Sequence, residues 1–380
     1  MNYEQAFENC CRKLEHHMAQ IPGDNPEFCA CRDGRYFDHQ KSLEFRNIQT
    51  WMPSFFMGEI LLAYEWTREK RYLDWLEKFR SVYADKVYLY PEETMHDLGF
   101  LYLPYAVGMW QTTKEKVYRD MALKAADELA KRFTIEGRYI RAWGKNGDME
   151  RAGEAIIDCM MNIPLLFWAY DETGIPLYRE IGMAHADTTL SCFVRADGSL
   201  YHAYHFDLET GRPMWGCNYC GYDDESFWAR GCAWAIYGFV TAYIYTKAER
   251  YREISERLLQ RFQRECRSEE DGIPLWDFRL PEGVPERKDT SAAAITVSAA
   301  FELAECTGQK SYRDYARQLL NVLLHDKYFD SRENIPGILK ESNGLGHYTL
   351  FGDYFFMEAL LKALKGNDFD KIWRRSRDEE

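Results

Sequence analysis

The stretch WARGCAWAIYGFVTAYIYT, residues 228–246, is followed after three residues by the charged stretch RYREISERLLQRF, residues 250–262. The first stretch is apolar nearly all round and contains small residues, so it predicts a buried helix that its neighbours approach closely. The second carries one apolar stripe on a charged background, which predicts an amphipathic helix with a solvent face. Together they predict a helical hairpin with an inner and an outer member.

This pairing of an apolar with a charged helix recurs along the chain. The other apolar stretches are residues 55–66, 98–110, 155–170, 291–307 and 351–364, and the other charged stretches are residues 3–21, 71–79, 117–129, 177–186 and 311–323. A tyrosine marks five charged stretches, at Tyr72, Tyr118, Tyr178, Tyr251 and Tyr312, with spacings of 46, 60, 73 and 61 residues. Six inner and six outer helices predict an all-α fold, a closed (α/α)6 barrel or six-hairpin toroid in which the first and last elements meet.

No linker rich in Pro, Gly or Ser divides the chain, so we predict one barrel domain over residues 1–380. The widest gap in the repeat is residues 194–227, where polar and apolar residues alternate between turn residues. This pattern predicts a short β-hairpin or a long loop. Long loops at one mouth of a barrel commonly carry function.

Composition excludes several classes of protein. A net charge of −13 argues against binding to nucleic acid or to an anionic membrane. We expect neither an export signal nor a membrane span, because the N-terminus is charged and no long apolar run exists. The 11 scattered cysteines favour reduced thiols and a cytoplasmic location. The 16% aromatic content fits a large core, or a groove whose flat faces suit pyranose rings.

Two aspartates lie in apolar stretches. Asp158, in AIIDCMMNIPLL, is expected in the middle of a buried helix. It either caps a neighbouring helix or has a pKa raised by burial, which would let it donate a proton near neutral pH. Asp97, in TMHDLGFLY, is a helix N-cap or the second member of a carboxyl pair. Two carboxyl groups at one barrel mouth are the usual equipment of glycoside chemistry.

The segment GYDDESFWARGCAWAIYG, residues 221–238, brings Trp228, Arg230 and Trp234 to one helix start. Arg230 either receives a substrate carboxylate or pairs with a neighbouring acid, Asp223 or Asp224. Trp51 and Trp143 fall in predicted loops or at helix starts, where exposed indoles suggest a ligand.

A zinc site is an alternative interpretation of the hairpin region. His202, His205, Cys217 and Cys220 have the spacing of zinc ligands. The two histidines would point to opposite faces of an extended segment, which weakens a four-ligand site. We therefore expect no metal, and we expect no cofactor because GxGxxG, GxxxxGK[ST], HExxH and GxSxG are absent.

Taken together, HDLGFLY, IRAWG, IIDCMMNIPLLFWA, HAYHFD, GYDDESFWARGCAWAIYGF, WDF, DTSAAAI and FGDYFFMEAL resemble the unsaturated glucuronyl hydrolases of glycoside hydrolase family 88. The resemblance runs from about Trp51 to Leu364, and its most specific parts are HDLGF, IIDCMMN and the WARGxAW segment. It implies an (α/α)6 barrel, in agreement with the repeat. It also implies release of a 4,5-unsaturated glucuronic acid from lyase-generated oligosaccharides, by hydration of the vinyl ether.

The resemblance also implies roles for individual residues. Asp158 would be the acid that also activates water, assisted by Asp97 and its neighbour His96. The remaining predicted site residues are those expected to bind the unsaturated oligosaccharide: Trp51, Trp143, His202, Cys220, Trp228, Arg230 and Trp234. Of these, Trp51 and Trp143 would stack on sugar rings, and Arg230 would lie near the uronate carboxylate.

The sequence departs from the family pattern at two cysteines. Cys220 and Cys232 stand where the family commonly has glutamine, which changes the expected polar recognition because cysteine is a poor hydrogen-bond partner. Residues 341–350, ESNGLGHYTL, lack the Ser-x-Ser-x-Lys type of pattern carried by members that favour sulfated substrates, so we expect little dependence on sulfate.

Other functions remain as alternatives: an unsaturated rhamnogalacturonyl hydrolase, a sugar epimerase on the same fold, or a carbohydrate-binding toroid without catalysis. The WARGCAW segment favours the glucuronyl family over the first. An epimerase would rely on paired histidines where the inner helices offer aspartates. The presence of both Asp97 and Asp158 argues against loss of catalysis. The sequence leaves the oligomeric state open.

Overall fold

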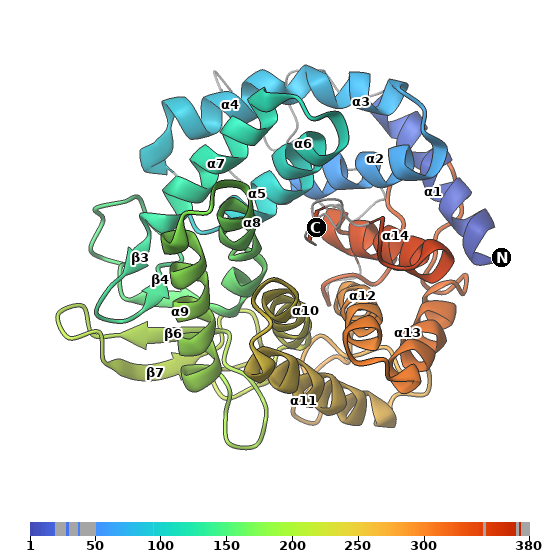
Figure 1. Cartoon of the computed structure of the whole chain (residues 1–380). Helices are drawn as coiled ribbons and strands as arrows, with labels where there is room; N and C mark the ends of the chain where they lie inside the picture. Colours follow the sequence, from blue (N-terminus) through green and yellow to red (C-terminus); the bar gives the residue numbers. More distant parts are fainter. Residues whose placement is uncertain are drawn as a thin grey trace.

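The computed structural model describes residues 1–19, 28–29, 37–38, 51–93, 95–344, 347–369 and 372–373. Within these residues, helices form two concentric rings, with the inner members surrounded by the outer ones (Figure 1). The first outer helix, α1 (Tyr3–Met18), contacts the last inner helix, α14 (Leu350–Lys365), which in turn contacts the first inner helix, α2 (Pro53–Thr67). The barrel is closed by this contact, as the repeat predicts.

The inner ring contains the apolar segments. Besides α2 and α14, it consists of α5 (Leu98–Tyr102) continued by the π-helical turn η3 (Leu103–Val107) and α6 (Gly108–Thr113), of η4 (Ile157–Met161) with α8 (Pro164–Thr173), of α10 (Ala229–Thr246), and of α12 (Thr290–Thr307). Two inner members are therefore interrupted, at segments that contain Pro104 and Pro164. A proline removes a backbone donor and cannot extend an α-helix from its interior.

The outer ring contains the charged segments. Besides α1, it consists of α3 (Arg71–Leu76), η1 (Glu77–Phe79) and α4 (Arg80–Leu89), then α7 (Lys116–Ala130), α9 (Pro176–Cys192), α11 (Glu249–Glu265) and α13 (Lys310–Leu323). The short segments η2 (Pro91–Glu93) and η5 (Cys266–Ser268) lie in the connections. The predicted (α/α)6 barrel is confirmed, with six inner and six outer members in the described part of the chain.

A threonine ends five of the inner members. Each hydroxyl donates to the carbonyl four residues earlier and accepts from the amide two residues later, at Thr67, Thr113, Thr173, Thr246 and Thr307. The next residue has a left-handed backbone in every case: Arg68, Lys114, Gly174, Lys247 and Gly308. The left-handed residue ends the inner helix and turns the chain toward the outer helix, and these hydrogen bonds occupy carbonyls of the last helical turn.

The repeated tyrosine lies five residues after each threonine and joins neighbouring outer helices. Tyr72 donates to Glu15 at 2.8 Å, and Tyr178 donates to Asp127 at 2.5 Å. Tyr251 donates to Asp187 at 2.8 Å, and Tyr118 donates to Glu77. The repeat seen in the sequence is thus a structural element of the outer ring.

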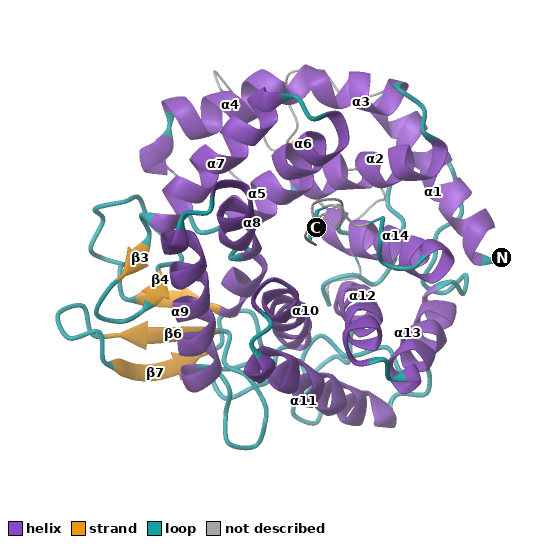
Figure 2. Cartoon of the chain, in the orientation of Figure 1, coloured by secondary structure: helices purple, strands orange, loops and turns teal. Residues whose placement is uncertain are grey.

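The strands within residues 133–140 and 203–217 lie at one side of the barrel (Figure 2). The strands β5 (Glu154–Ile156), β6 (Ala203–Phe206) and β7 (Pro213–Cys217) form an antiparallel sheet in that order. The short strands β3 (Phe133–Thr134) and β4 (Tyr139–Ile140) form a hairpin beside it, and β1 (Phe28–Cys29) pairs with β2 (Phe37–Asp38). The predicted hairpin in residues 194–227 is confirmed as β6 and β7. The third strand, β5, falls where the sequence predicted helix.

Candidate active site

The ten predicted site residues come from segments that precede or begin inner helices. Trp51 precedes α2, His96 and Asp97 precede α5, and Trp228 is the N-cap residue of α10, whose first turns carry Arg230 and Trp234. Trp143 follows β4, Asp158 lies in η4, His202 directly precedes β6, and Cys220 follows β7. One end of the inner ring therefore carries them all.

The prediction that Asp158 lies in the middle of a helix is wrong. Its backbone belongs to a five-residue 3-10 helix that directly follows β5, and α8 begins only at Pro164. Ile157 donates its amide to the carbonyl of His202, so the sheet, rather than a helix, fixes the backbone at this point. No described backbone amide donates to the Asp158 carboxyl group, so the residue does not cap a neighbouring helix.

Asp97 stands at the N-cap position of α5, but its side chain makes no capping hydrogen bond. The carboxyl group faces His96, with 3.3 Å between Asp97 Oδ1 and His96 Nε2. The capping interpretation of this aspartate is therefore not what the structure shows. The buried Asn162 instead anchors α5: its Oδ1 accepts from the amide of Phe100 at 2.8 Å, and its Nδ2 donates to the carbonyl of Asp158 at 3.3 Å. Asn162 thereby holds the two aspartate-bearing segments together.

Asp158 faces a second histidine, with 3.3 Å between Asp158 Oδ2 and His202 Nε2. Burial by itself would raise the pKa of Asp158, but the hydrogen bond and charge of His202, together with the charge of Arg230, outweigh burial and lower it. Burial likewise lowers the pKa of His202, and its contacts with Asp158 and Cys220 more than offset this and raise the pKa to about 9. At neutral pH the two side chains therefore form a carboxylate–imidazolium pair.

The other histidine–carboxyl pair has the opposite charge state. Burial lowers the pKa of His96 to about 3, so its ring is neutral. Burial and the charge of Asp158 raise the pKa of Asp97 to about 7, even though Arg132 and Lys86 act in the other direction. The sequence predicted a raised pKa at Asp158. In the structure the raised pKa belongs to Asp97, because burial prevails there, whereas His202 and Arg230 lower the pKa of Asp158.

Arg230 pairs with neither Asp223 nor Asp224. Its Nη1 donates to Asp289 Oδ2 at 2.8 Å, and Asp289 has no solvent exposure. Asp289 is also the N-cap residue of α12 and accepts from the amide of Ala292. The guanidinium carbon of Arg230 lies 4.8 Å from the ring centre of Trp228. The guanidinium group is therefore oriented by Asp289 and packs against the Trp228 ring.

The four predicted tryptophans have different environments. Trp51 and Trp143 are partly exposed, as expected for residues that meet a ligand. Trp228 is almost buried and lies edge-on to His202, with 4.9 Å between ring centres. Trp234 has no exposure and packs on Phe100, Phe351 and Phe355, so it forms part of the aromatic core beneath the site.

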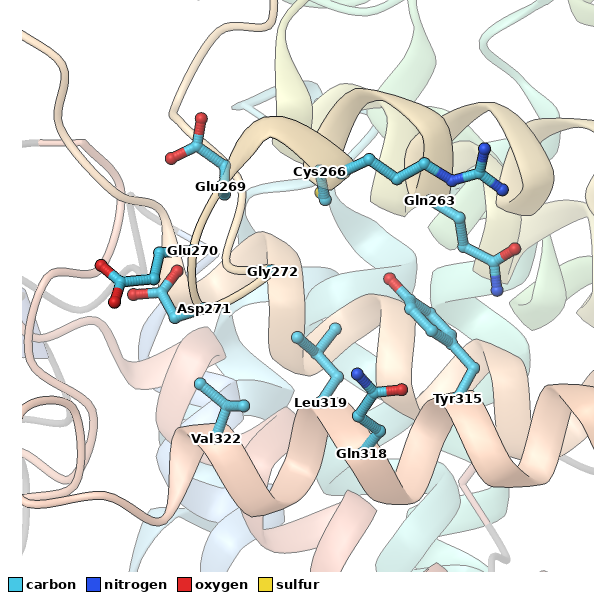
Figure 3. A pocket seen from close by; sticks show the side chains of 11 residues that line it. Gln263, Cys266, Glu269, Glu270, Asp271, Gly272, Tyr315, Gln318, Leu319 and Val322 are labelled. Atoms are coloured by element: carbon cyan, nitrogen blue, oxygen red, sulfur yellow. The ribbon is translucent and has the colours of Figure 1, made fainter.

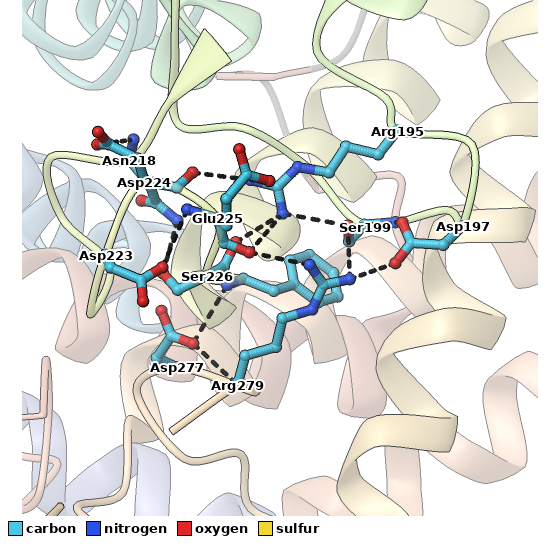
Figure 4. Close-up of polar contacts among 11 residues, drawn as sticks. Arg195, Asp197, Ser199, Asn218, Asp223, Asp224, Glu225, Ser226, Asp277 and Arg279 are labelled. Atoms are coloured by element: carbon cyan, nitrogen blue, oxygen red, sulfur yellow. Dashed lines mark hydrogen bonds and ion pairs between the residues drawn. The ribbon is translucent and has the colours of Figure 1, made fainter. Parts of the chain in front are cut away.

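Cys220 is exposed, in the loop that joins β7 to α10. Polar contacts hold this loop in place (Figure 4). Arg195 donates to the carbonyls of Asp224, Glu225 and Ser226, and Asp277 accepts from the amides of Tyr222 and Phe227. These contacts fix the backbone of the loop at five residues, from Tyr222 to Phe227.

The zinc alternative is not supported. No group of three or more His, Cys, Asp or Glu side chains among the described residues is placed to hold a metal ion. His202 faces Asp158, whereas His205 Nε2 lies 3.4 Å from the sulfur of Cys217 and 3.0 Å from the hydroxyl of Tyr219. The four residues serve two separate clusters.

Sequence reasoning missed four residues that organise the site: Asn162, Asp289, Arg132 and Tyr219. The buried Arg132 donates to the carbonyls of residues 141–144 and so fixes the turn that carries Trp143. Tyr219 lies between Trp143 and His202, with ring centres 5.6 and 5.9 Å away. Arg132 lies just after the end of α7, and nothing in the sequence indicates that it is buried or which carbonyls it meets.

A cavity of about 490 Å³ lies elsewhere, beside the C-terminal part of α11 and α13 (Figure 3). Its walls include Gln263, Glu270, Tyr315 and Leu319, and none of the predicted site residues. The site described above is therefore defined by its side chains and not by this cavity. None of the described helices is long and apolar enough to cross a membrane.

Carboxyl groups paired with imidazoles at one mouth of a helical barrel are suited to acid catalysis on sugars, which defines the class of (α/α)6 glycoside hydrolases. Residues 31–359 match the model of Glycosyl Hydrolase Family 88. The chain belongs to this family, that of the unsaturated glucuronyl hydrolases.

Named relatives agree with this assignment. The chain is 34% identical to the unsaturated glucuronyl hydrolase of Bacillus sp. strain GL1, over 83% of this chain and 86% of the relative. It is 33% identical to the unsaturated chondroitin disaccharide hydrolase of Streptococcus pyogenes serotype M1, over 97% and 92%. The solved structure of the Bacillus enzyme, described as responsible for the degradation of glycosaminoglycan, aligns with a TM-score of 0.90 at 30% identity, covering 99% and 100% of the two chains.

A ligand-bound structure is also similar. An Asp-to-Asn variant of the unsaturated glucuronyl hydrolase of Streptococcus agalactiae, solved in complex with dGlcA-GalNAc6S, aligns with a TM-score of 0.79 at 26% identity. The alignment covers 96% of this chain and 91% of that one.

Proposed function

We propose that the protein releases 4,5-unsaturated glucuronic acid from the non-reducing end of lyase-generated glycosaminoglycan-type oligosaccharides. The observation that carries this proposal is the pairing of the Asp158 carboxyl group with the charged His202, beside Arg230. The substrate brings a carboxylate, and Arg230 has a guanidinium held in place by Asp289 to receive it. The complex of a relative with dGlcA-GalNAc6S supports binding of an unsaturated uronide.

The reaction begins with proton transfer from Asp158 to C4 of the unsaturated ring. Positive charge then develops at C5 and the ring oxygen. A water molecule adds to C5 and gives its proton to the Asp158 carboxylate, which restores the acid. The resulting hemiketal opens, the bond to the next sugar breaks, and the uronate becomes a keto acid. Protonation of carbon is slow, so the reaction depends on an acid fixed in a site from which water is largely excluded.

The pKa of Asp158 is lowered in the structure, whereas a proton donor must carry a proton near neutral pH. Substrate binding therefore has to raise this pKa. The Asp158–His202 pair together holds one proton, and His202 carries it when no ligand is present. A bound carboxylate raises the pKa of both Asp158 and His202 through its negative charge, whereas the displacement of water disfavours the charged form of each. The displacement of water therefore favours the arrangement in which Asp158 is protonated and His202 is neutral. Asp97 is partly protonated near pH 7, so it adds less negative charge beside Asp158 than a fully ionised carboxylate would.

A panel of unsaturated disaccharides from different lyases tests the proposal. Turnover removes the conjugated double bond, so the ultraviolet absorbance of the substrate should fall. We expect unsulfated disaccharides to be used at least as well as sulfated ones, although Leu345 and Gly346 of the segment behind this expectation lie outside the described residues. Binding without loss of absorbance for all glucuronyl substrates would favour the non-catalytic toroid, and use of a rhamnose-linked substrate alone would favour a rhamnogalacturonyl hydrolase.

A further inference from the structure

Exposed aromatic side chains continue outward from the site along β7 and the loop that follows it. Trp215 is 54% exposed and Tyr219 is 50% exposed. Neither belongs to the predicted site residues. Leaving this much apolar surface in water forgoes the stabilisation that burial would give, so a contiguous pair beside a site marks a surface with a binding role.

One face of Trp215 is covered and the other is open. Trp215 in β7 is the cross-strand partner of His205 in β6, and the two rings stack with 4.7 Å between centres at 20°. His205 is held in turn by the Tyr219 hydroxyl, 3.0 Å from its Nε2, and by the Cys217 sulfur at 3.4 Å. The indole is therefore fixed from behind and presents a flat outer face.

The cluster is continuous with the site. The Tyr219 ring lies 5.9 Å from the ring of His202, which faces Asp158, and 5.6 Å from the ring of Trp143. A row of adjacent side chains therefore runs from Asp158 through His202, Tyr219 and His205 to Trp215. An oligosaccharide whose unsaturated end lies at Asp158 would extend along these rings.

The backbone of this surface is held by the contacts around Asn218. Its Oδ1 accepts from the amide of Gly221 at 2.9 Å, and its Nδ2 donates to Ser226 Oγ at 3.1 Å, inside the loop of Figure 4. A surface fixed before binding loses little conformational entropy when a ligand arrives.

The charges beside Trp215 indicate which sugar it accepts. Glu154 Oε1 lies 4.0 Å from His205 Nδ1, and Arg151 pairs with Glu154 at 3.0 Å. The guanidinium of Arg151 also covers one face of Trp143, at 4.1 Å from the ring centre. Arg151 is thus already engaged, and the acid Glu154 lies close to His205, which disfavours a sulfated ring. Flat indole faces suit the apolar side of a neutral pyranose.

We propose that Trp215, Tyr219 and His205 form a subsite for a neutral pyranose located beyond the sugar that carries the unsaturated uronate. This subsite rests on the proposed release of the unsaturated uronate and deepens it: the enzyme would use longer lyase products whose inner sugars are neutral, not only disaccharides. Trp215 sets the preference for chain length, because a disaccharide bound at Asp158 does not reach it.

The test compares an unsaturated disaccharide with an unsaturated tetrasaccharide whose sugars beyond the unsaturated uronate are all neutral, using the full chain. Replacing Trp215 by Ala should raise KM for the tetrasaccharide about tenfold, the size expected for loss of one aromatic stacking contact. It should leave kcat and the disaccharide KM unchanged. Trp215→Phe should restore part of the loss. Met214→Ala is the matched control, since Met214 is the neighbouring residue on β7 and its side chain points to the other face.

Equal effects on both substrates, or no effect on either, would overturn the subsite. Calorimetric titration of the tetrasaccharide into the unmodified chain and into the Trp215→Ala variant tests the subsite independently of turnover. If neither substrate is turned over but Trp215→Ala weakens tetrasaccharide binding, the proposed function fails and the subsite stands. If both are turned over and tetrasaccharide affinity does not depend on Trp215, the subsite fails alone.

Discussion

His202 Nε2 lies 3.3 Å from Asp158 Oδ2, so the carboxyl group proposed as the acid is directly paired with an imidazole. The titrations of the imidazole and the carboxyl group are coupled, because the contact between them lowers the pKa of Asp158 and raises that of His202, in each case against the effect of burial. The first two predictions follow from this pair.

Asp158→Asn should lower kcat by about 10²- to 10⁴-fold, the usual contribution of a positioned general acid. The amide has nearly the same shape, so the melting temperature should change little. Absorbance decay of an unsaturated disaccharide and circular dichroism measure the two effects. Asp120→Asn, at an ion pair with Lys116 on the outer surface, is the control and should keep full activity. Full activity in the Asp158 variant would remove this residue from the mechanism.

His202→Asn should move the basic limb of the pH profile of kcat/KM to lower pH. In the unmodified chain the shared proton is lost as pH rises through about 9, the value to which the pKa of His202 is raised. Without His202 the proton resides on Asp158 alone, whose pKa is lower, so activity is lost at lower pH. A pH series with one disaccharide measures the limb. An unchanged limb would show that the pair does not control proton supply.

Asp97→Asn should make stability less dependent on pH. The pKa of Asp97 is raised to about 7 in the folded protein, so the folded state binds more protons than the unfolded state between about pH 4 and 7. The free energy of unfolding therefore falls as pH rises through this window, by up to about 4 kcal/mol from this residue. Urea unfolding at pH 5 and pH 8 should give a smaller difference for the variant. Equal differences in the two proteins would contradict the raised pKa.

Arg230→Gln should raise KM more than it lowers kcat, with a loss of about 10- to 100-fold in kcat/KM, as expected for a charge-assisted hydrogen bond to a carboxylate. Asp289→Asn should give a weaker effect in the same direction, because it leaves the guanidinium present but less firmly oriented. Steady-state kinetics separates the two parameters. Arg250→Gln, which breaks an outer ion pair with Asp187, should leave both unchanged. A loss confined to kcat would argue against carboxylate recognition by Arg230.

Alkylation of the native protein should reduce activity through Cys220, which is exposed, whereas the other cysteines whose side chains the structure describes are buried or half-buried. The added group would stand next to His202, whose pKa responds to this thiol. Cys220→Ser should remain active and become resistant to the reagent. Cys220→Gln places the amide common in the family at this position and should retain turnover. Inactivation of the serine variant at the same rate as the parent would assign the effect to another thiol.

The helical repeat could be predicted because it is written in local patterns. An apolar helix, a threonine and, five residues later, a tyrosine on a charged helix recur, and the structure uses each of them within one hairpin or between adjacent ones. The hairpin of β6 and β7 was predicted for the same reason. The strand β5 was not, because it leads into a largely apolar segment that resembles a helix, and its pairing with β6 is decided 49 residues away, as the register of Ala155 with Tyr204 shows.

The sequence by itself determined the barrel and supplied the residues of the candidate site, because hydrophobic periodicity and residue type act over short distances. Only the tertiary structure decided that Arg230 pairs with Asp289, 59 residues away, and that the raised pKa belongs to Asp97 and not to Asp158. Only the tertiary structure also showed that Trp215 and Tyr219 both contact His205 at the edge of the site. Charge state and exposure depend on every group that surrounds a side chain, and those groups come from segments that meet only when the barrel closes.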